Sequence, residues 1–265
     1  MDSRSVFVGV DIGASRAKVA ALDADRTLIG HSVQKSGTDF AAVAEACLDA
    51  ALKMAERGKK DIVKAISTGY GRKNVPFTKE TKTEIACHAR GCYHYFPTAM
   101  TIIDIGGQDN KIIKIDQAGR RSSFKMNRKC AAGTGAFLEE MSMRLDIPLE
   151  DMDGLARQAK DMVELGSYCT VFSATEVLEK IRQGKAVPDI VKGLFFSVIK
   201  RIMEMDSMTE KVAMTGGVVA HNPFLVKMVE ELIGRDVLVP PFPQLTGAVG
   251  AALIAIEAVS GEEAL

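Results

Sequence analysis

The sequence lacks the features that mark proteins that bind nucleic acids or that span or cross membranes. Its 34 basic residues are balanced by 34 acidic ones, so no net field favours a polyanion. We find no run of about 18 apolar residues that would span a bilayer. The first five residues, Met1 to Ser5, have no apolar signal-peptide core. We therefore expect a cytoplasmic protein whose partners include neither nucleic acid nor membrane.

The chain also lacks paired-cysteine spacing. It has five cysteines and no C-x-x-C motif. In the cytoplasm, such cysteines are thiols or metal ligands more often than disulfides. Cys47 lies among Ala and Leu on a predicted helix, which favours a small buried side chain. Cys87 and Cys92 flank a predicted helix near His88 and His94, so a metal site there stays an alternative without the usual two-pair spacing.

What the sequence does contain is a repeated strand–turn–strand unit. Asp11-Ile12-Gly13 is followed by Lys18, and Asp104-Ile105-Gly106 by Lys111, each time seven residues after the aspartate. An apolar run precedes both copies. In such a turn, backbone N–H groups can face an anion and the aspartate can hold Mg²⁺. Two copies suggest a duplicated domain that closes on one nucleotide from both sides. Lys18 is either a phosphate contact or a solvated strand lysine.

The pattern of the whole chain predicts an α/β protein of two β-β-β-α-β-α halves. We expect a first lobe at 1–97 and a second at 98–265, with an α-helical insertion at about 130–206. The predicted strands are 6–11, 16–23, 27–34, 62–68, 100–105, 109–116, 121–126, 211–215 and 236–239. The predicted helices are 40–57, 83–95, 131–145, 148–160, 170–183, 187–206, 222–234 and one from about 245.

Two further glycine signals, Thr215-Gly216-Gly217 and Gly247-Ala-Val-Gly250, complete a set that resembles the actin, heat-shock-70 and hexokinase ATPase superfamily. The resemblance implies a duplicated ribonuclease H-like fold that binds ATP or ADP with Mg²⁺. It implies that Asp104 or Gln108 orients the hydrolytic water. The nucleotide-binding residues that it implies are Asp11, Gly13, Ser15, Lys18, Gly106, Gly107, Gly133, Gly216 and Gly217.

Longer motifs narrow the resemblance. They are Ser67-Thr-Gly-Tyr-Gly-Arg72, Cys87-His-Ala-Arg-Gly91, Asp104-Ile-Gly-Gly-Gln-Asp109, Met126-Asn-Arg-Lys-Cys-Ala-Ala-Gly-Thr-Gly135 and Cys169-Thr-Val-Phe172. This set is similar to the 2-hydroxyacyl-CoA dehydratase activators and the ATP-binding subunits of benzoyl-CoA reductase. That family implies an ATP-driven one-electron reductase whose homodimer holds one [4Fe–4S] cluster. Ferredoxin or flavodoxin is the implied donor, and an iron–sulfur acyl-CoA dehydratase or reductase the implied acceptor. Arg72 has either a surface or a functional role.

The two cysteines in these motifs suit that chemistry. Cys130 and Cys169 each precede a predicted helix, whose N-terminal dipole would stabilise a thiolate or an anionic cluster. A cubic cluster takes four thiolates, so two-fold symmetry would supply the second pair. From spacing alone, two reactive but unligated thiols stay an alternative.

The chain departs from the activator pattern at four places. Where the activators usually have Gly-Ser-Thr, this chain has Gly13-Ala14-Ser15. It has Arg128 in place of their usual aspartate and Ala174 in place of their usual glutamate. Its turn at 216–222 is one residue longer than theirs. These departures put the cognate partner in doubt. A small-molecule kinase of the same superfamily is the alternative function, and an ATP-gated assembly protein is a third.

Overall fold

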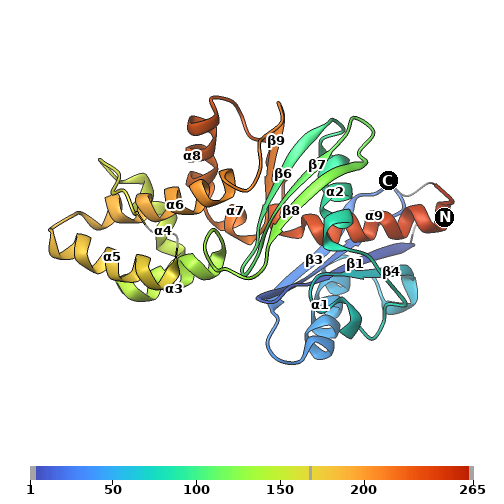
Figure 1. The fold of residues 1–265 in the computed structure, drawn as a ribbon. Helices are drawn as coiled ribbons and strands as arrows, with labels where there is room; N and C mark the ends of the chain where they lie inside the picture. The colour runs from blue at the N-terminus through green and yellow to red at the C-terminus, as the bar shows by residue number, and fades with distance from the viewer. Residues whose placement is uncertain (1–3, 167–168, 263–265) are drawn as a thin grey trace. The chain divides into compact units, whose positions relative to one another are not determined.

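The computed structural model describes residues 4–166 and 169–262, and within them the strands form two sheets (Figure 1). The first sheet has the order β3-β2-β1-β4-β5, with β1 antiparallel to β2 and parallel to β4. The second has the order β8-β7-β6-β9. The strands are β1 (Val6–Ile12), β2 (Arg16–Leu22), β3 (Leu28–Lys35), β4 (Ile62–Thr68), β5 (Glu80–Thr81), β6 (Met100–Ile105), β7 (Asn110–Ile115), β8 (Arg121–Asn127) and β9 (Val212–Thr215).

Helices follow the strands in the same order in both halves of the chain. After the first three strands come α1 (Phe40–Met54), β4 and α2 (Glu84–Tyr95), and after the second three come four helices and β9. The remaining helices are α3 (Gly135–Leu145), α4 (Met152–Arg157), α5 (Thr170–Arg182), α6 (Val187–Met203), α7 (Gly217–His221), α8 (Pro223–Ile233) and α9 (Thr246–Ser260).

Contacts divide the chain into two compact units that are discontinuous in sequence. Unit 1 comprises 1–99, 113–123 and 244–265, and unit 2 comprises 100–112 and 124–243. The division runs through β7 and β8. The lobes expected at 1–97 and 98–265 are contiguous stretches, so they are a different partition of the chain and stay a prediction.

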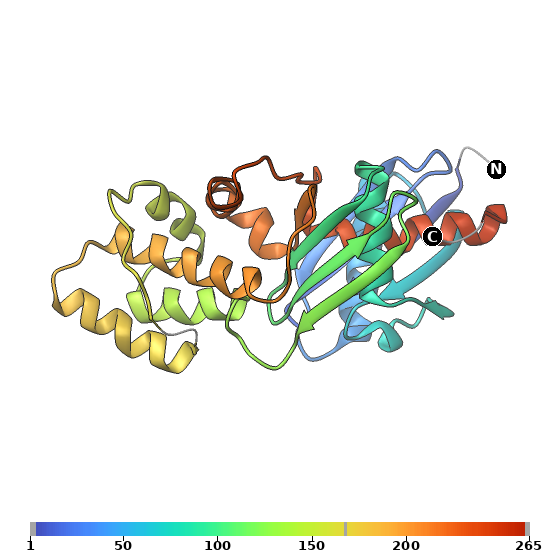
Figure 2. The same ribbon diagram turned by 45° about the horizontal axis from the view of Figure 1, so that its top comes forward.

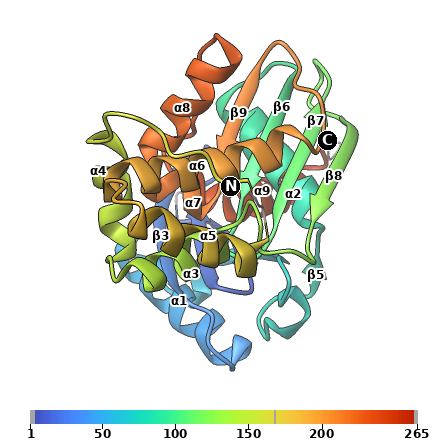
Figure 3. The same cartoon turned by 60° about the vertical axis from the view of Figure 1, so that its left-hand side comes forward.

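The core of unit 1 is built around α9, which packs on β1 and lies alongside α2 (Figure 3). Its residues from Thr246 to Glu257 are all buried. Small residues let the backbones approach closely. A Cβ added to Gly250 would lie 1.8 Å from the carbonyl oxygen of Cys87 on α2, and one on Gly9 of β1 would lie 1.8 Å from that of Ala248. Only glycine fits at these two crossings.

The apolar character of α9 corrects one sequence-based expectation. The stretch Pro243–Ser260 is long and apolar enough to cross a membrane by composition, contrary to our statement that no run is. In the structure 72% of it is buried. Burial on all sides by β1, β2, β4 and α2 accounts for its hydrophobicity, as expected for a core helix.

The core of unit 2 lies around α6, whose buried residues from Ile190 to Ile202 pack with those of α3, α4, α5 and α8 (Figure 2). Gly193 allows the close approach of the segment before α5, because a Cβ there would lie 2.0 Å from the carbonyl oxygen of Val163. The helical insertion therefore shares one apolar core with the strands β6 and β9.

Most predicted elements are confirmed with ends that differ by up to three residues, and three predictions depart further from the structure. The helix expected at 131–145 begins only at Gly135, because Gly133 has a φ of +80° and Thr134 is the N-cap. The helix expected at 148–160 is a single 3₁₀ turn followed by α4. The strand expected at 236–239 is one isolated bridge between Leu238 and Ala213.

The crossing of α2 and α9 predicts a large cost for a single added methyl. We expect Gly250→Ala to lower the free energy of unfolding by about 3 kcal/mol, since the Cβ would overlap a backbone carbonyl that cannot move away. Gly154→Ala in α4 is the matched control, because nothing lies within 4 Å of its added Cβ. It should be neutral or stabilising by up to about 1 kcal/mol. Urea denaturation followed by circular dichroism measures both, and equal stabilities would contradict the packing argument.

Candidate nucleotide and thiol sites

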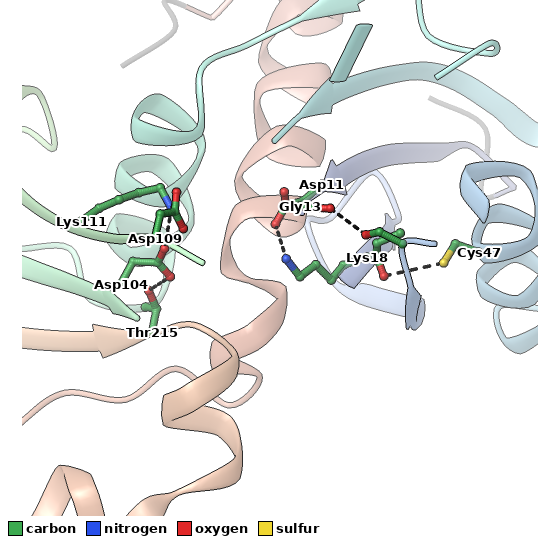
Figure 4. Close-up of polar contacts among 10 residues, drawn as sticks. Asp11, Gly13, Lys18, Cys47, Asp104, Asp109, Lys111 and Thr215 are labelled. Carbon is green, nitrogen blue, oxygen red and sulfur yellow. Dashed lines mark hydrogen bonds and ion pairs between the residues drawn. The ribbon is translucent and has the colours of Figure 1, made fainter. Parts of the chain in front are cut away.

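The first Asp-Ile-Gly turn is closed by an ion pair. Asp11 and Lys18 stand opposite each other in the β1–β2 register, and the Lys18 Nζ lies 3.0 Å from Asp11 Oδ2 (Figure 4). Both side chains are largely buried. The Gly13 N–H donates to the Arg16 carbonyl at 3.0 Å, and the hydroxyl of Ser36 donates to the Gly13 carbonyl at 2.6 Å. Ser15 is half-buried in this turn.

Three motif segments of unit 1 gather around Asp11. Gly69, with φ +92°, lies so close that a Cβ would be 2.6 Å from Asp11 Oδ1. Gly247 of α9 would place a Cβ 3.2 Å from Asp11 Oδ2 and 3.1 Å from Nε2 of the buried His88. Arg72 is half-buried and its Nη1 donates to the Gly69 carbonyl at 3.0 Å. Its side chain therefore supports this loop.

The second turn repeats the first with one more carboxylate. The Lys111 Nζ lies 3.0 Å from Asp104 Oδ2 and 2.9 Å from Asp109 Oδ2 (Figure 4). The Thr215 hydroxyl donates to Asp104 Oδ1 at 3.0 Å, and the Gly106 N–H donates to the Asp109 carbonyl at 2.9 Å. Asp104 and Lys111 are buried, whereas Gln108 at the tip of the turn is exposed.

The seven-residue spacing of aspartate and lysine is thus the register of a hairpin. In both turns the lysine neutralises the aspartate, and the glycine N–H bonds within the turn. The N–H groups of Gly13 and Gly106 are already engaged in this way, so these two glycines would let a phosphate approach the backbone closely, while the donors would be N–H groups later in each turn. The individual nucleotide roles of Asp11, Ser15 and Lys18 stay predictions.

The Gly216-Gly217 turn follows β9 in the same unit and lies against the end of β6. Gly216 has a φ of +101°, and a Cβ on it would be 2.3 Å from the Ile105 carbonyl oxygen. Its N–H donates to the Pro243 carbonyl at 3.0 Å. Thr215, the last residue of β9, stands opposite Asp104 in the β6–β9 register and donates to it, so this turn begins one residue after that contact.

Burial separates the five cysteines into two classes. Cys47, Cys87 and Cys92 are fully buried, whereas Cys130 and Cys169 are exposed. Desolvation raises the pKa of Cys47, and it raises the pKa of Cys87 to about 12. Among the described residues, no group of three or more His, Cys, Asp or Glu side chains could hold a metal ion, so the metal site considered at Cys87 and Cys92 is not supported.

Cys130 does not lie at a helix start, contrary to our expectation. It precedes the first residue of α3 by five positions, and a helix dipole acts only within about the first turn. Instead, the Asn127 side chain holds the loop: its Nδ2 donates to the Cys130 carbonyl at 2.9 Å, and its Oδ1 accepts from the Cys130 N–H at 3.3 Å. The thiol is therefore presented by a fixed loop.

Cys169 is the N-cap residue of α5, as predicted. Helices α3 and α5 pack together, and a groove between them is lined by Glu140 and Arg144 of α3 and by Thr170, Ala174 and Leu178 of α5. Both exposed thiols thus lie in unit 2, Cys130 in the loop between β8 and α3 and Cys169 at the N-cap of α5. Two exposed thiols in one chain suit half of the four-thiolate set that a cubic iron–sulfur cluster takes.

Comparison with known proteins is decisive for the family. The model of the BadF/BadG/BcrA/BcrD ATPase family matches residues 8–255. The chain belongs to this family. An activator of lactoyl-CoA dehydratase from Anaerotignum propionicum is 41% identical over 254 residues, covering 95% of this chain and 97% of that protein.

Solved structures of relatives agree with this assignment. The (R)-2-hydroxyglutaryl-CoA dehydratase component A of Acidaminococcus fermentans has a TM-score of 0.91 at 33% identity, covering 97% of this chain and 99% of that one. The activator of 2-hydroxyisocaproyl-CoA dehydratase from Clostridium difficile, solved with bound ADPNP, has a TM-score of 0.89 at 34% identity, covering 97% and 96%. A sugar kinase, the ROK glucokinase of Streptomyces griseus, has a TM-score of 0.57 at 14% identity and shares the fold alone. The predicted actin-like ATPase fold is confirmed, and ATP is the nucleotide of this ATPase family.

Sequence reasoning missed several residues of this family member. Asp109 joins the second ion pair, Asn110 bonds to the Gly133 carbonyl, and Arg90 forms a buried ion pair with Glu257 of α9. A carboxylate within an apolar helix such as α9 was the one signal that could have indicated Glu257. The partners of Asn110 and Asp109 depend on loop conformations that no spacing encodes.

The two lysines predict unequal costs of the same substitution. Lys111→Met removes the ammonium group that pairs with the carboxylates of Asp104 and Asp109, and Asp104 is buried. We therefore expect a loss of about 3–5 kcal/mol in the free energy of unfolding. Lys18→Met should cost less, because the Lys18 side chain is 15% exposed and contacts one carboxylate. Denaturant unfolding of both variants measures the difference. Equal losses would contradict the burial argument.

The cysteine classes predict selective alkylation. At about pH 8, iodoacetamide should modify Cys130 and Cys169 of the folded protein, because both side chains are exposed. Cys87 is fully buried and burial raises its pKa to about 12, so it should stay unmodified while the protein is folded. Peptide mass spectrometry identifies the sites, and unfolding in urea is the positive control. Labelling of Cys87 ahead of Cys130 would contradict the assignment.

Proposed function

We propose that this protein is an ATP-hydrolysing activator that drives one electron at a time into an iron–sulfur acyl-CoA dehydratase or reductase. The observation that carries the proposal is the pair of exposed cysteines, Cys130 and Cys169, in an ATPase whose other three cysteines are buried. The relatives named as dehydratase activators support it, since they match nearly the whole chain.

The proposed ATP contacts follow from the two turns. We assign Asp11, Gly13, Ser15 and Lys18 of unit 1 to phosphate and Mg²⁺ binding. Because Asp11 already pairs with Lys18, it would hold Mg²⁺ through water. From unit 2 we assign Gly106, Gly107 and Gly133 to the phosphates, and Gly216 and Gly217 to the adenosine.

Two residues divide the hydrolytic role. Both carboxylate oxygens of Asp104 are engaged, one by Lys111 and the other by Thr215. Asp104 would therefore keep the turn in place. Gln108 is exposed at the tip of the turn, and its amide can both donate to and accept from a water, so we assign it to orient the hydrolytic water.

We assign Cys130 and Cys169 of two subunits as the four ligands of one cluster. A bound [4Fe–4S] cluster would supply the low-potential electron that the partner enzyme receives. The residues fit the group: both thiols are exposed, Asn127 fixes the loop of Cys130, and Cys169 begins α5. The N–H groups at the start of α5 would stabilise negative charge beside Cys169.

The proposed partners follow from the family. A second copy of the chain completes the ligand set, a ferredoxin or flavodoxin donates the electron, and the setting is the cytoplasm. Arg128 and Lys129 are exposed beside Cys130, so the surface around that thiol is cationic. The kinase alternative is not favoured, because the sugar kinase shares the fold at only 14% identity.

Iron content tests the ligand assignment. Protein purified without oxygen should be brown, with about four irons per dimer. Cys130→Ala and Cys169→Ala should each remove the iron and the reduced-cluster EPR signal, because two of the four ligands are lost per dimer. Both variants should still bind ADPNP.

Cys47→Ala is the matched control, since it removes a fully buried thiol. It should keep the iron. An unchanged EPR signal in either exposed-cysteine variant would overturn the ligand assignment. Colourless wild-type protein that phosphorylates a small molecule would support the kinase alternative instead.

A further inference from the structure

The second nucleotide turn caps the helix that follows Cys130. The first N–H groups of a helix have no partner within the helix. In α3 the N–H of Gly135 donates to the Gly106 carbonyl at 2.9 Å, and that of Ala136 donates to the Gly107 carbonyl at 2.7 Å. The turn at 106–107 is therefore joined directly to the start of α3 by two hydrogen bonds.

Asn110 adds a third bond at the same place. It directly follows the turn, it is 1% exposed, and its Nδ2 donates to the Gly133 carbonyl at 2.9 Å. Gly133 has a φ of +80°, and a Cβ on it would lie 2.8 Å from that Nδ2 and 3.1 Å from Cγ of Arg201. The backbone at 133 is thus held in a conformation and a space that only glycine takes.

The segment between Gly133 and Cys130 is held from its other side by Asn127. Its Nδ2 donates to the carbonyls of Cys130 at 2.9 Å and of Ala132 at 3.2 Å. The four residues 130–133 consequently connect two side-chain amides, one of which belongs to the nucleotide turn. Both ends of this short segment are therefore restrained by hydrogen bonds.

We infer that Asn110 is a positioning residue that couples the state of the nucleotide turn to the position of Cys130. The inference rests on the proposed function, because it takes ATP to bind at Gly106-Gly107 and Cys130 to be the ligand. Asn110 itself touches neither group. Its side chain moves with β7 and pulls on the Gly133 carbonyl, and the short segment passes the displacement to the thiol. Coupling of this kind needs two arrangements of one element that the nucleotide distinguishes.

Alkylation of Cys130 in the full-length, iron-free protein tests the coupling. The rate is measured with and without saturating ADPNP, and peptide mass spectrometry resolves Cys130 from Cys169. In the wild type we expect ADPNP to change the Cys130 rate by about fivefold or more. In Asn110→Leu, which keeps the number and branching of the side-chain heavy atoms but cannot donate, the ADPNP-dependent change should be lost while ADPNP still binds. Asn110→Ser, which is too short to reach Gly133, should give the same result if the leucine variant does not fold.

Ser142→Ala is the matched control. It removes a hydrogen bond of the same kind, from the Ser142 hydroxyl to the Ile147 carbonyl at 2.7 Å, at the other end of α3. It should retain the ADPNP response, so general loosening of α3 does not account for the loss. An ADPNP response that persists in both Asn110 variants, or that is absent in ADPNP-bound wild type, overturns the inference alone. Failure of the wild type to bind ADPNP overturns the proposed function as well.

Discussion

A lysine ammonium held against an aspartate carboxylate closes each of the two turns on which the rest of the site depends. Without Lys18 or Lys111, the aspartate at the end of β1 or β6 would be a largely buried charge without its counter-ion. With the lysine, the carboxylate can remain ionised and can organise its neighbours. Gly69 and Gly247 approach Asp11, and Thr215 donates to Asp104. The ion pair therefore fixes the turn before any ligand binds.

The duplicated pair also shows where the two halves diverge. The second turn carries Asp109 as an additional carboxylate and continues into Asn110, whereas the first has Arg16 and Ala17 at the matching positions. In the second turn the carbonyls of Gly106 and Gly107 accept from the first N–H groups of α3, whereas in the first turn the Ile12 carbonyl accepts from the Gly71 N–H in the loop after β4. The same hairpin has thus become a simple closed turn in one half and a connection to the thiol loop in the other.

Much of the fold could be predicted because its strands and long helices carry strong local signals. Strands such as Val6–Ile12 and Met100–Ile105 are buried throughout and largely apolar, and α1 and α6 have helical periodicity over several turns. The errors lie where a single backbone conformation overrides the pattern. The residues after Cys130 favour helix by composition, yet Gly133 with its positive φ delays α3 to Gly135.

The sequence by itself determined the chemistry of the protein, because chemistry depends on residue type and spacing. Two Asp-Ile-Gly turns with a lysine seven residues on, and two cysteines in long motifs, are readable along the chain. Only the tertiary structure decided the partners: that Lys111 bridges Asp104 and Asp109, that Arg90 meets Glu257, and that Asn110 and Asn127 hold the residues between them. Some of these contacts join residues up to 167 positions apart, and others depend on the backbone dihedrals of loops. Local residue patterns predict neither which distant residues meet nor where φ is positive.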